Sequence, residues 1–266
     1  MQYTTGSQAL DELMGGYNTG VLHCFYGVTG AGKTTLSAYN PIAQIHKVMV
    51  ESKKLDDNHK YIVVDGDGGF DMDRLAQVCH GAGIDDVDSV FDHLQYYQPV
   101  EFKAQHDYIV DMDKTIKNKK WLPLFIAADP MVAIYRGNVM RSARNMKMAT
   151  IGDMTGRLDQ QLTVLRQLAV DYGMVAVCSS WPGSAVGDAM GAKPGETPVI
   201  GGRAFGYFPK LMVEIRRPNE FSHLREAYLF KHRSKPSGKT CFFSLTEDGV
   251  SDITDEEVAT QILRTA

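Results

Sequence analysis

The sequence of 266 residues contains few of the features that mark specialised protein classes. It has only four cysteines, Cys24, Cys79, Cys178 and Cys241, and no two of them are spaced like zinc ligands or a redox pair. Three of them fall in apolar, strand-like runs, so we expect reduced thiols in a core. No run approaches the ~18 apolar residues of a membrane span, and residues 1–6 lack the basic-then-apolar pattern of a signal peptide. These absences favour a cytoplasmic protein without a membrane partner.

The chain also lacks a strong net charge. Its formal net charge is −4, so any binding of nucleic acid has to depend on a local basic surface rather than on whole-protein attraction. The charges are unevenly spread: residues 61–92 contain eight Asp and one Arg, whereas residues 200–240 contain nine Lys or Arg and three Glu. With 44% hydrophobic residues, no internal repeat and no visible boundary, the composition predicts a single α/β domain over residues 1–266.

The most specific motif in the chain is a glycine-rich loop at residues 27–34. It fits G-x-x-x-x-G-K-[ST], the phosphate-binding loop of nucleotide hydrolases. It follows an apolar run, Val21–Tyr26, which predicts a buried strand, and it leads into a segment compatible with a helix, Lys33–His46. The motif requires this context; the alternative is a chance glycine-rich turn after a strand. The predicted nucleotide-binding residues are Gly27, Val28, Thr29, Gly30, Ala31, Gly32, Lys33, Thr34 and Thr35.

The residue types of this loop suit ATP with Mg²⁺. Glycines let successive backbone N–H groups point at one phosphate, and the start of the following helix adds its positive dipole end. Lys33 brings a mobile positive charge to the β- and γ-phosphates, which makes it a catalytic candidate. The Thr34 hydroxyl is placed to ligate Mg²⁺, a cation that takes oxygen ligands.

Two further strand-like runs lead to acidic residues. Tyr61–Asp65 is β-branched and continues into the acidic, glycine-rich segment Asp65–Phe70, and Leu122–Asp129 is an apolar run that ends in an acid. Ligands of open α/β sheets bind outside the carboxyl ends of the strands, so these carboxylates should share one rim with the phosphate loop. Many buried strands end in Asp, but downstream of a phosphate loop Asp129 becomes the candidate that holds Mg²⁺.

The remaining pattern predicts alternating helices and strands, then strands alone. Predicted helices are Gln8–Met14, a helix capped by Asp71 and reaching His80, Glu101–Lys120 and Asp153–Tyr172. Further predicted strands are Leu94–Tyr97, Met174–Cys178, Leu211–Ile215, Ala227–Phe230 and Cys241–Leu245. The last three have no helices between them, so they should pair antiparallel. Residues 182–198 are rich in Gly, Pro, Ser and Ala and predict a long loop of the kind that is often functional.

A basic segment lies between the second of these acid-ended runs, Leu122–Asp129, and the next predicted helix. Residues 136–149 contain Arg136, Arg141, Arg144 and Lys147 and no acidic residue. One interpretation is a solvated loop with one partly buried face; the other is a flexible basic loop that binds a polyanion.

The chain resembles a known family from its first residues onward. Residues 5–13 with Gly15, Gly16 and Gly20 are similar to the lead-in of archaeal RadA and RadB, which are RecA-type recombinase ATPases. The resemblance continues through the phosphate loop, the Asp65–Phe70 segment and Asp129, and it ends at residues 231–236 and a C-terminal strand pair. The N-terminal helical DNA-binding domain of RadA is not found in this sequence, so we expect RadB to be the nearer type.

This resemblance implies a RecA-type core, a mainly parallel sheet flanked by helices with antiparallel strands at its C-terminal edge. It implies that two loops, here residues 136–152 and 183–200, contact single- or double-stranded DNA, with Arg136, Arg141, Arg144 and Lys147 as the contacting cations. It also implies a homo-oligomer with nucleotide at the subunit interface, and a recombinase as a further candidate partner. Lys231 and Arg233 alternate with His232, so period two puts both cations on one sheet face. They are either a solvated strand end or cations that reach a neighbouring subunit's nucleotide.

Two departures from the family bear on hydrolysis. The family usually has a Glu after the second strand that activates the attacking water, and this chain offers Asp67, which is one methylene shorter. After the fourth strand the family usually has an Asn-Gln pair whose Gln senses the γ-phosphate, and the matching positions here are Ser179 and Ser180. Asp67 therefore becomes the candidate base, and we expect slow hydrolysis with nucleotide binding intact.

These observations favour an ATP-binding RecA-type protein that acts on DNA in recombination or repair. One alternative is an ATPase switch of the KaiC type that acts on protein partners, against which the basic segment argues. A second is a nucleotide-binding regulator without useful hydrolysis. A small-molecule kinase fits less well, because the antiparallel C-terminal region does not suit it.

Overall fold

The computed structural model describes residues 1–144, 148–183, 199–201, 203–218, 223–254 and 256–258. Its central element is a nine-stranded sheet of order β11-β10-β9-β8-β3-β7-β6-β4-β5. The strands are β3 (Val21–Gly27), β4 (His59–Asp65), β5 (Leu94–Tyr97), β6 (Leu122–Asp129), β7 (Val175–Ser180), β8 (Leu211–Arg216), β9 (Leu224–His232), β10 (Thr240–Thr246) and β11 (Gly249–Ser251). A separate pair joins β1 (Gln2–Tyr3) to β2 (Tyr17–Asn18). The predicted α/β fold of RecA type, mainly parallel with antiparallel C-terminal strands, is confirmed.

Strand β3 lies in the middle of the parallel part of the sheet. It pairs in parallel with β7 on one side and with β8 on the other, and β6, β4 and β5 continue the parallel order. All seven residues of β3 are buried, as expected for a strand covered on both faces. Because the carboxyl ends of parallel strands share one edge, Gly27, Asp65, Asp129 and Ser180 come to the same rim.

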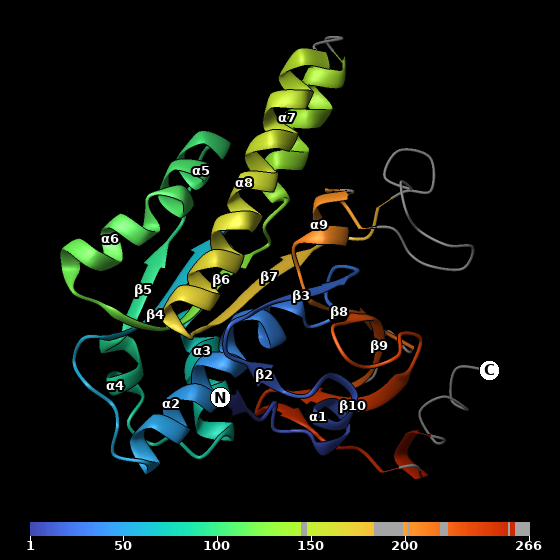
Figure 1. Cartoon of the computed structure of the whole chain (residues 1–266). Helices are drawn as coiled ribbons and strands as arrows, with labels where there is room; N and C mark the ends of the chain where they lie inside the picture. Colours follow the sequence, from blue (N-terminus) through green and yellow to red (C-terminus); the bar gives the residue numbers. More distant parts are fainter. Residues whose placement is uncertain (145–147, 184–198, 202, 219–222, 255, 259–266) are drawn as a thin grey trace.

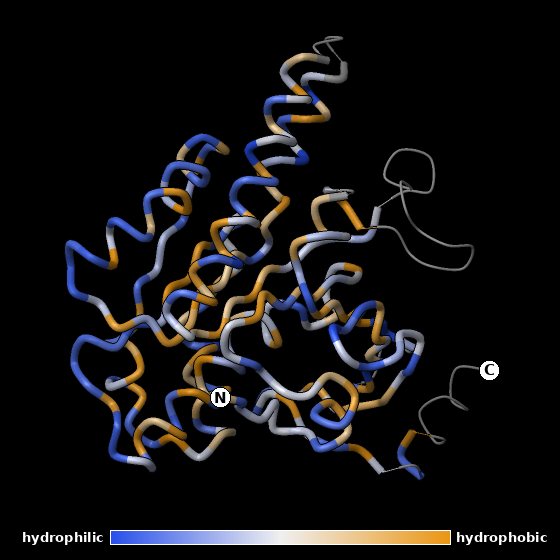
Figure 2. Tube along the Cα trace, in the orientation of Figure 1, coloured by the Kyte–Doolittle hydropathy of each residue, from blue (hydrophilic) through white to orange (hydrophobic). Residues whose placement is uncertain are grey.

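Helices cover both faces of the sheet (Figure 1). One core joins the sheet to α1 (Gln8–Met14), α2 (Asn40–Glu51), α3 (Met72–Gly81) and α4 (Val87–Asp92). The other core joins it to α5 (Phe102–Val110), α6 (Met112–Lys119), α7 (Ala133–Arg144), α8 (Met148–Tyr172) and α9 (Arg203–Tyr207). Figure 2 shows hydrophobic stretches along the central strands and polar stretches along the outer surfaces of the helices. None of the described helices combines the length and the hydrophobicity that a membrane span requires.

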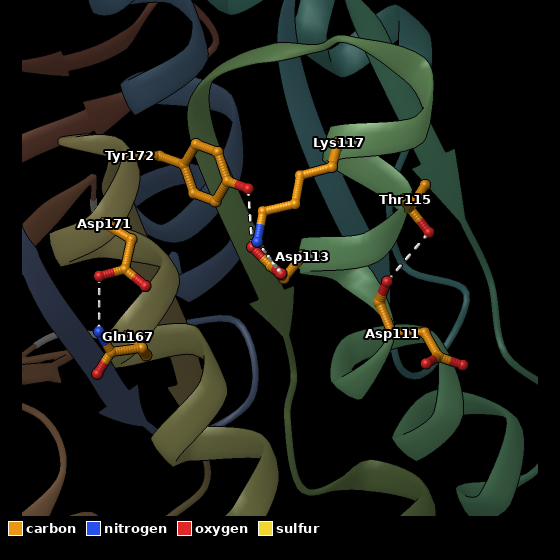
Figure 3. Close-up of polar contacts among 7 residues, drawn as sticks. All are labelled: Asp111, Asp113, Thr115, Lys117, Gln167, Asp171 and Tyr172. Atoms are coloured by element: carbon orange, nitrogen blue, oxygen red, sulfur yellow. Dashed lines mark hydrogen bonds and ion pairs between the residues drawn. The ribbon is translucent and has the colours of Figure 1, made fainter.

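The predicted single helix Glu101–Lys120 is two helices, α5 and α6, separated at Asp111. The backbone carbonyl of Asp111 accepts hydrogen bonds from the backbone and the hydroxyl of Thr115, so a new helix starts there. Tyr172, at the end of α8, donates its hydroxyl to Asp113 over 2.8 Å, and Lys117 pairs with the same carboxylate over 2.7 Å (Figure 3). The contact with α8 thus holds α6 in its own direction, which the local periodicity does not reveal.

The prediction of a flexible loop at residues 136–149 is wrong for most of its length. Residues 133–144 form α7, which packs along α8, and the two helices project together beyond the sheet (Figure 1). Tyr135 and Thr155 join them by a hydroxyl–hydroxyl hydrogen bond of 3.1 Å. Helix α8 also begins at Met148, earlier than the predicted start at Asp153. Residues 145–147 lie outside the described part.

The C-terminal strands pair antiparallel as predicted, in the order β8, β9, β10 and β11. Strand β8 has a second, parallel partner in β3, so this region extends the central sheet rather than forming its own. Asp252, just after β11, accepts hydrogen bonds from the Ser7 hydroxyl and from the backbone of Gln8 and Ala9 at the start of α1. The lead-in and the C-terminal strands therefore brace each other.

Candidate functional site

The glycine-rich loop connects the carboxyl end of β3 to a helix, as the sequence predicts. Gly30 and Gly32 have φ angles of +74° and +96°, a backbone conformation that side-chain-bearing residues rarely adopt. The helix continues to Glu51, past the predicted end at His46, and its stretch Thr35–Tyr39 is π-helical. The Tyr17 hydroxyl donates to the Leu36 carbonyl over 3.0 Å, so the lead-in supports the irregular turn next to the loop. π-turns of this kind are frequent at functional sites.

Lys33 points back over the loop that contains it. Its ammonium donates to the Val28 carbonyl over 2.9 Å, and the residue is 8% exposed. Burial lowers the pKa of Lys33, while the carboxylates of Asp129 and Asp67 act in the opposite direction. A buried cation held only by a carbonyl and by nearby carboxylates is a ready partner for a phosphate.

Asp129 lies at the end of β6, almost fully buried beside the loop. Its carboxylate accepts a hydrogen bond from the Ser179 hydroxyl, and the hydroxyls of Thr34 and Ser37 lie near it. Burial raises the pKa of Asp129, and these three hydroxyls together with the charge of Lys33 oppose that shift. The predicted pair, Thr34 and Asp129, therefore lies together in the wall of one cavity, where both side chains present oxygen atoms.

The segment after β4 is organised by Asp65, which is buried. One carboxylate oxygen of Asp65 accepts the backbone N–H groups of residues 67, 68 and 69, and the other accepts the N–H of Phe70 and the Tyr96 hydroxyl. Asp65 thus shapes the loop, which leaves Asp67 as the carboxylate at the rim. Loss of hydration raises the pKa of Asp67, and the nearby charges of Asp129 and Asp65 add to the shift.

A cavity of about 310 Å³ lies where these elements meet. It brings together most of the predicted nucleotide, metal and catalytic residues with two that were not predicted. Its lining is Thr29, Gly30, Gly32, Lys33, Thr34, Thr35, Asp67, Asp129, Pro130 and Trp181. Three predicted loop residues stand outside this lining: Gly27 ends β3, Val28 is exposed with its carbonyl bound to Lys33, and Ala31 is buried.

The last two residues of β7, Ser179 and Ser180, do not simply take over the roles of an Asn-Gln pair. The Ser179 hydroxyl is bound to Asp129, and the Ser180 hydroxyl donates to the Ile200 carbonyl over 3.1 Å. Among the described residues it is the next one, Trp181, that forms part of the cavity wall. Its position directly after a buried strand at the ligand-binding edge is the signal that could have identified it.

Two basic residues, Arg225 of β9 and Arg217 just after β8, lie against the loop from its other side, and the sequence did not predict them. The Arg225 guanidinium donates to the Ala31 carbonyl over 3.2 Å and is 8% exposed. Burial lowers the pKa of Arg225, as does the charge of Arg217. A side chain built onto Gly30 would lie 3.1 Å from the Arg217 guanidinium, so this cation also lies against the loop. The start of β9 therefore braces the phosphate loop.

The predicted DNA-contacting residues lie on α7 and beyond it. Arg136 is exposed, and its guanidinium carbon lies 5.8 Å from the ring centroid of Trp181. Arg141 is exposed and donates to Asn138 on the same helix over 2.6 Å. The side chain of Arg144, the whole of Lys147 and residues 184–198 of the second predicted loop lie outside the described part.

Lys231 and Arg233 lie far from the phosphate loop of their own chain. His232 pairs with Leu211, at the amino end of β8, which is the edge opposite the loop. The Lys231 ammonium is half-buried and donates to the carbonyls of Gly206 and Pro209 over 2.6 and 2.8 Å. Strand β9 is longer than predicted and ends at His232, so Arg233 stands just beyond it, exposed. Neither cation can reach the nucleotide cavity of its own subunit.

A phosphate loop at the carboxyl end of the middle strand, with acidic residues on neighbouring strand ends, defines a P-loop protein with a RecA-type core. The chain belongs to the Rad51 family, whose model matches residues 1–253.

Curated relatives support this assignment over nearly the full chain. It is 29% identical over 256 residues to the DNA repair and recombination protein RadB of Thermococcus onnurineus, covering 96% of this chain and 99% of the relative. It is 26% identical over 251 residues to the protein of the same name from Archaeoglobus fulgidus, covering 94% and 98%. The predicted similarity to RadB is confirmed.

Proposed function

We propose that this protein binds ATP with Mg²⁺, binds DNA, and acts in recombination or repair. The last part follows the names of its relatives, which state DNA repair and recombination for those proteins. The observation that carries this proposal is the cavity in which Lys33, Thr34, Asp67 and Asp129 converge. Acidic residues and a buried lysine on a phosphate loop form a site for a polyphosphate with a divalent cation, not for an apolar ligand.

The residues present fit both parts of this ligand. Thr34 and Asp129 both line the cavity, and both offer oxygen atoms of the kind that Mg²⁺ prefers. Lys33 would exchange its bond to the Val28 carbonyl for the β- and γ-phosphates. When bound, Mg²⁺ adds neutralisation of phosphate charge to that of Lys33. The cavity is thus suited to ATP, and it offers Asp67 as the group that orients or deprotonates water.

Slow hydrolysis is supported by how the site is arranged. Asp67 is shorter than the usual Glu and is held in part by the Gly69 backbone N–H, which donates to it over 3.1 Å. Ser179 and Ser180 are bound to Asp129 and to the Ile200 carbonyl. The described part of the site therefore presents no side-chain amide from these two positions to a γ-phosphate. A site that binds ATP tightly and hydrolyses it slowly suits a protein that acts in its ATP-bound state.

Binding of DNA is proposed for the surface of α7. Residues 136–144 contain three arginines and no acidic residue, and Arg136 and Arg141 are exposed there. Arginines on one projecting helix can neutralise successive phosphates of a nucleic acid backbone. The same helix starts four residues after Asp129, so the proposed DNA surface and the nucleotide site are built from one continuous segment.

Replacing Arg141 and Arg144 by alanine is expected to weaken binding of single-stranded DNA by roughly tenfold at about 0.1 M salt. The slope of log affinity against log salt should also flatten by about 1.5, because two fewer phosphate contacts release fewer counterions. Fluorescence anisotropy with labelled DNA measures both. The matched control is Lys114→Ala with Lys119→Ala on α6, which removes the same charge from exposed positions and should change neither. Equal salt slopes for the α7 variant and wild type would indicate that α7 is a solvated helix that does not contact DNA. That result would favour the alternative function, an ATPase switch of the KaiC type that acts on protein partners.

Nucleotide at a subunit interface is also proposed, with Lys231 and Arg233 acting on a neighbouring subunit. Their position at the edge opposite their own phosphate loop supports this, because only another subunit's nucleotide is open to them. We expect Lys231→Ala with Arg233→Ala to retain ATP binding in the monomer but to lose ATP-dependent assembly and residual hydrolysis, since a cation in trans neutralises γ-phosphate charge. Light scattering and phosphate release measure these.

Two controls belong to this test. Arg233→Ala alone avoids disturbing the bonds from Lys231 to Gly206 and Pro209, and it should show the same direction of change. A mixture of the double variant with Lys33→Ala should recover activity, because one supplies the nucleotide site and the other the cations. Normal assembly and hydrolysis by the double variant, or an inactive mixture, would contradict action on a neighbouring subunit. Lys231 and Arg233 would then have only a structural role.

A further inference from the structure

Trp181 lies at the meeting point of three parts of the molecule. Trp181 lines the nucleotide cavity, together with Lys33 and Asp67. Its carbonyl accepts the Ile200 backbone N–H over 3.0 Å, and the next residue, Pro182, bridges to Val199. The residue therefore ties the nucleotide cavity to both ends of the segment 182–200.

A third contact joins Trp181 to α7. The Arg136 guanidinium lies over its ring at 5.8 Å from the centroid, a distance at which a cation is attracted to the face of an indole. Arg136 is exposed, so the same guanidinium is open to a phosphate from solvent. The contact between Trp181 and Arg136 thus lies between the nucleotide cavity and the surface proposed to bind DNA.

The neighbouring polar side chains are already engaged elsewhere. Ser179 is bound to Asp129, and Ser180 is bound to the Ile200 carbonyl, so both hydroxyls serve to hold the strand end in place. Trp181 is therefore the residue of this strand end that meets the cavity and α7 together.

We propose that the Trp181 indole is a positioning residue that couples occupancy of the nucleotide cavity to α7 through Arg136. This inference rests on the proposed function. A nucleotide that fills the cavity changes what the ring packs against, and a ring that shifts changes where the Arg136 guanidinium is held. A DNA phosphate that binds Arg136 acts on the ring in the reverse direction. Because coupling free energies are reciprocal, nucleotide should change DNA affinity by the same factor by which DNA changes nucleotide affinity.

The first test uses tryptophan fluorescence, since the chain has only two tryptophans. In Trp121→Phe, Trp181 is the sole emitter, and addition of Mg²⁺ with a non-hydrolysable ATP analogue should shift its emission with a saturating dependence. Single-stranded DNA added afterwards should shift it again. The matched control is Trp181→Phe, in which only Trp121, next to Lys119 at the far end of β6, emits and should stay unchanged. An emission from Trp181 that responds to nucleotide but not to DNA would overturn the coupling.

The second test measures the coupling factor itself, as the ratio of DNA affinities with and without the analogue. We expect a ratio of roughly fivefold or more for wild type. It should fall to within about twofold of unity in Trp181→Ala and in Arg136→Gln, and the double variant should lose no more than either alone, because the two act through one contact. Trp181→Phe should keep most of the ratio, since it retains an aromatic face for the cation.

The outcomes separate the inference from the function on which it rests. Wild-type protein that binds no nucleotide or no DNA would remove the proposed function and this inference with it. Wild-type protein that binds both, together with a wild-type ratio in Trp181→Ala, would overturn the inference alone. The ratio is independent of any direct loss of DNA affinity in Arg136→Gln, because that loss affects both measurements equally.

Discussion

Lys33→Ala is expected to weaken binding of ATP with Mg²⁺ by roughly 100-fold or more, which corresponds to about 3 kcal/mol. The Lys33 ammonium is buried in the cavity wall, and its bond to the Val28 carbonyl holds it over the loop. A phosphate that replaces this carbonyl gains a charge-assisted hydrogen bond in a partly dry site, and alanine offers nothing in its place. Isothermal titration calorimetry with a non-hydrolysable analogue measures the change directly.

A lysine with a similar local contact provides the control. The Lys47 ammonium, further along the same helical segment, donates to the Ala82 carbonyl over 2.8 Å, away from the cavity. Lys47→Ala should leave nucleotide affinity within about twofold while removing the same charge and the same type of hydrogen bond. Unchanged affinity in Lys33→Ala, with the Lys47 variant as reference, would refute the phosphate-loop interpretation.

Asp67→Asn is expected to retain nucleotide but to lower hydrolysis by roughly 100-fold, because an amide cannot accept the proton of an attacking water. Asp67→Glu is expected to raise the rate by restoring the reach of the longer carboxylate. Phosphate release in single-turnover conditions separates these effects from product release. The control is Asp71→Asn in the same segment: Asp71 caps α3 by accepting the Arg74 backbone N–H over 2.8 Å, and Asn caps as well as Asp.

The pH dependence gives a second test of the same residue. Loss of hydration and the carboxylates of Asp129 and Asp65 raise the pKa of Asp67 above its ordinary value. Because only the ionised form can accept a proton, the hydrolysis rate should fall as pH drops through this raised pKa, at a higher pH than for an ordinary aspartate. Asp67→Asn should abolish that step. A normal rate for Asp67→Asn, with the same pH profile, would point to another base.

The parts of the site that the sequence predicts are those set by local chemistry. Long apolar runs that end in Gly27, Asp65 and Asp129 are recognisable as buried strands, and parallel strands bring their carboxyl ends to one edge. The convergence of Thr34, Lys33 and Asp129 then follows from topology, and the structure shows it.

The parts that the sequence misses depend on contacts between distant residues. Helix α6, which begins after the break at Asp111, is joined to α8 by a hydrogen bond between Asp113 and Tyr172, which are 59 residues apart. Helix α7 contains Gly137 and a weak apolar pattern, so its helical form depends on packing against α8, where Tyr135 meets Thr155. Short-range periodicity in the sequence reveals neither the distant hydrogen bond nor the packing of one helix against another.

The same reason applies to the residues around the nucleotide cavity. Arg225 reaches the Ala31 carbonyl from a strand almost two hundred positions away, because β9 pairs with β8 and β8 pairs with β3. Trp181 can be predicted more easily than Arg225, since it directly follows a strand that ends at the ligand-binding edge.

The central claim is that one chain binds nucleotide at its phosphate loop and DNA at α7, and that bound nucleotide changes the affinity for DNA. The most direct measurement is fluorescence anisotropy of labelled single-stranded DNA titrated with full-length protein across a salt series, with and without Mg²⁺ and a non-hydrolysable ATP analogue. We predict binding that weakens linearly in log salt, with an affinity that the nucleotide changes by roughly fivefold or more. DNA binding that is absent at low salt, or that is identical with nucleotide, without nucleotide and in Lys33→Ala, would contradict the account.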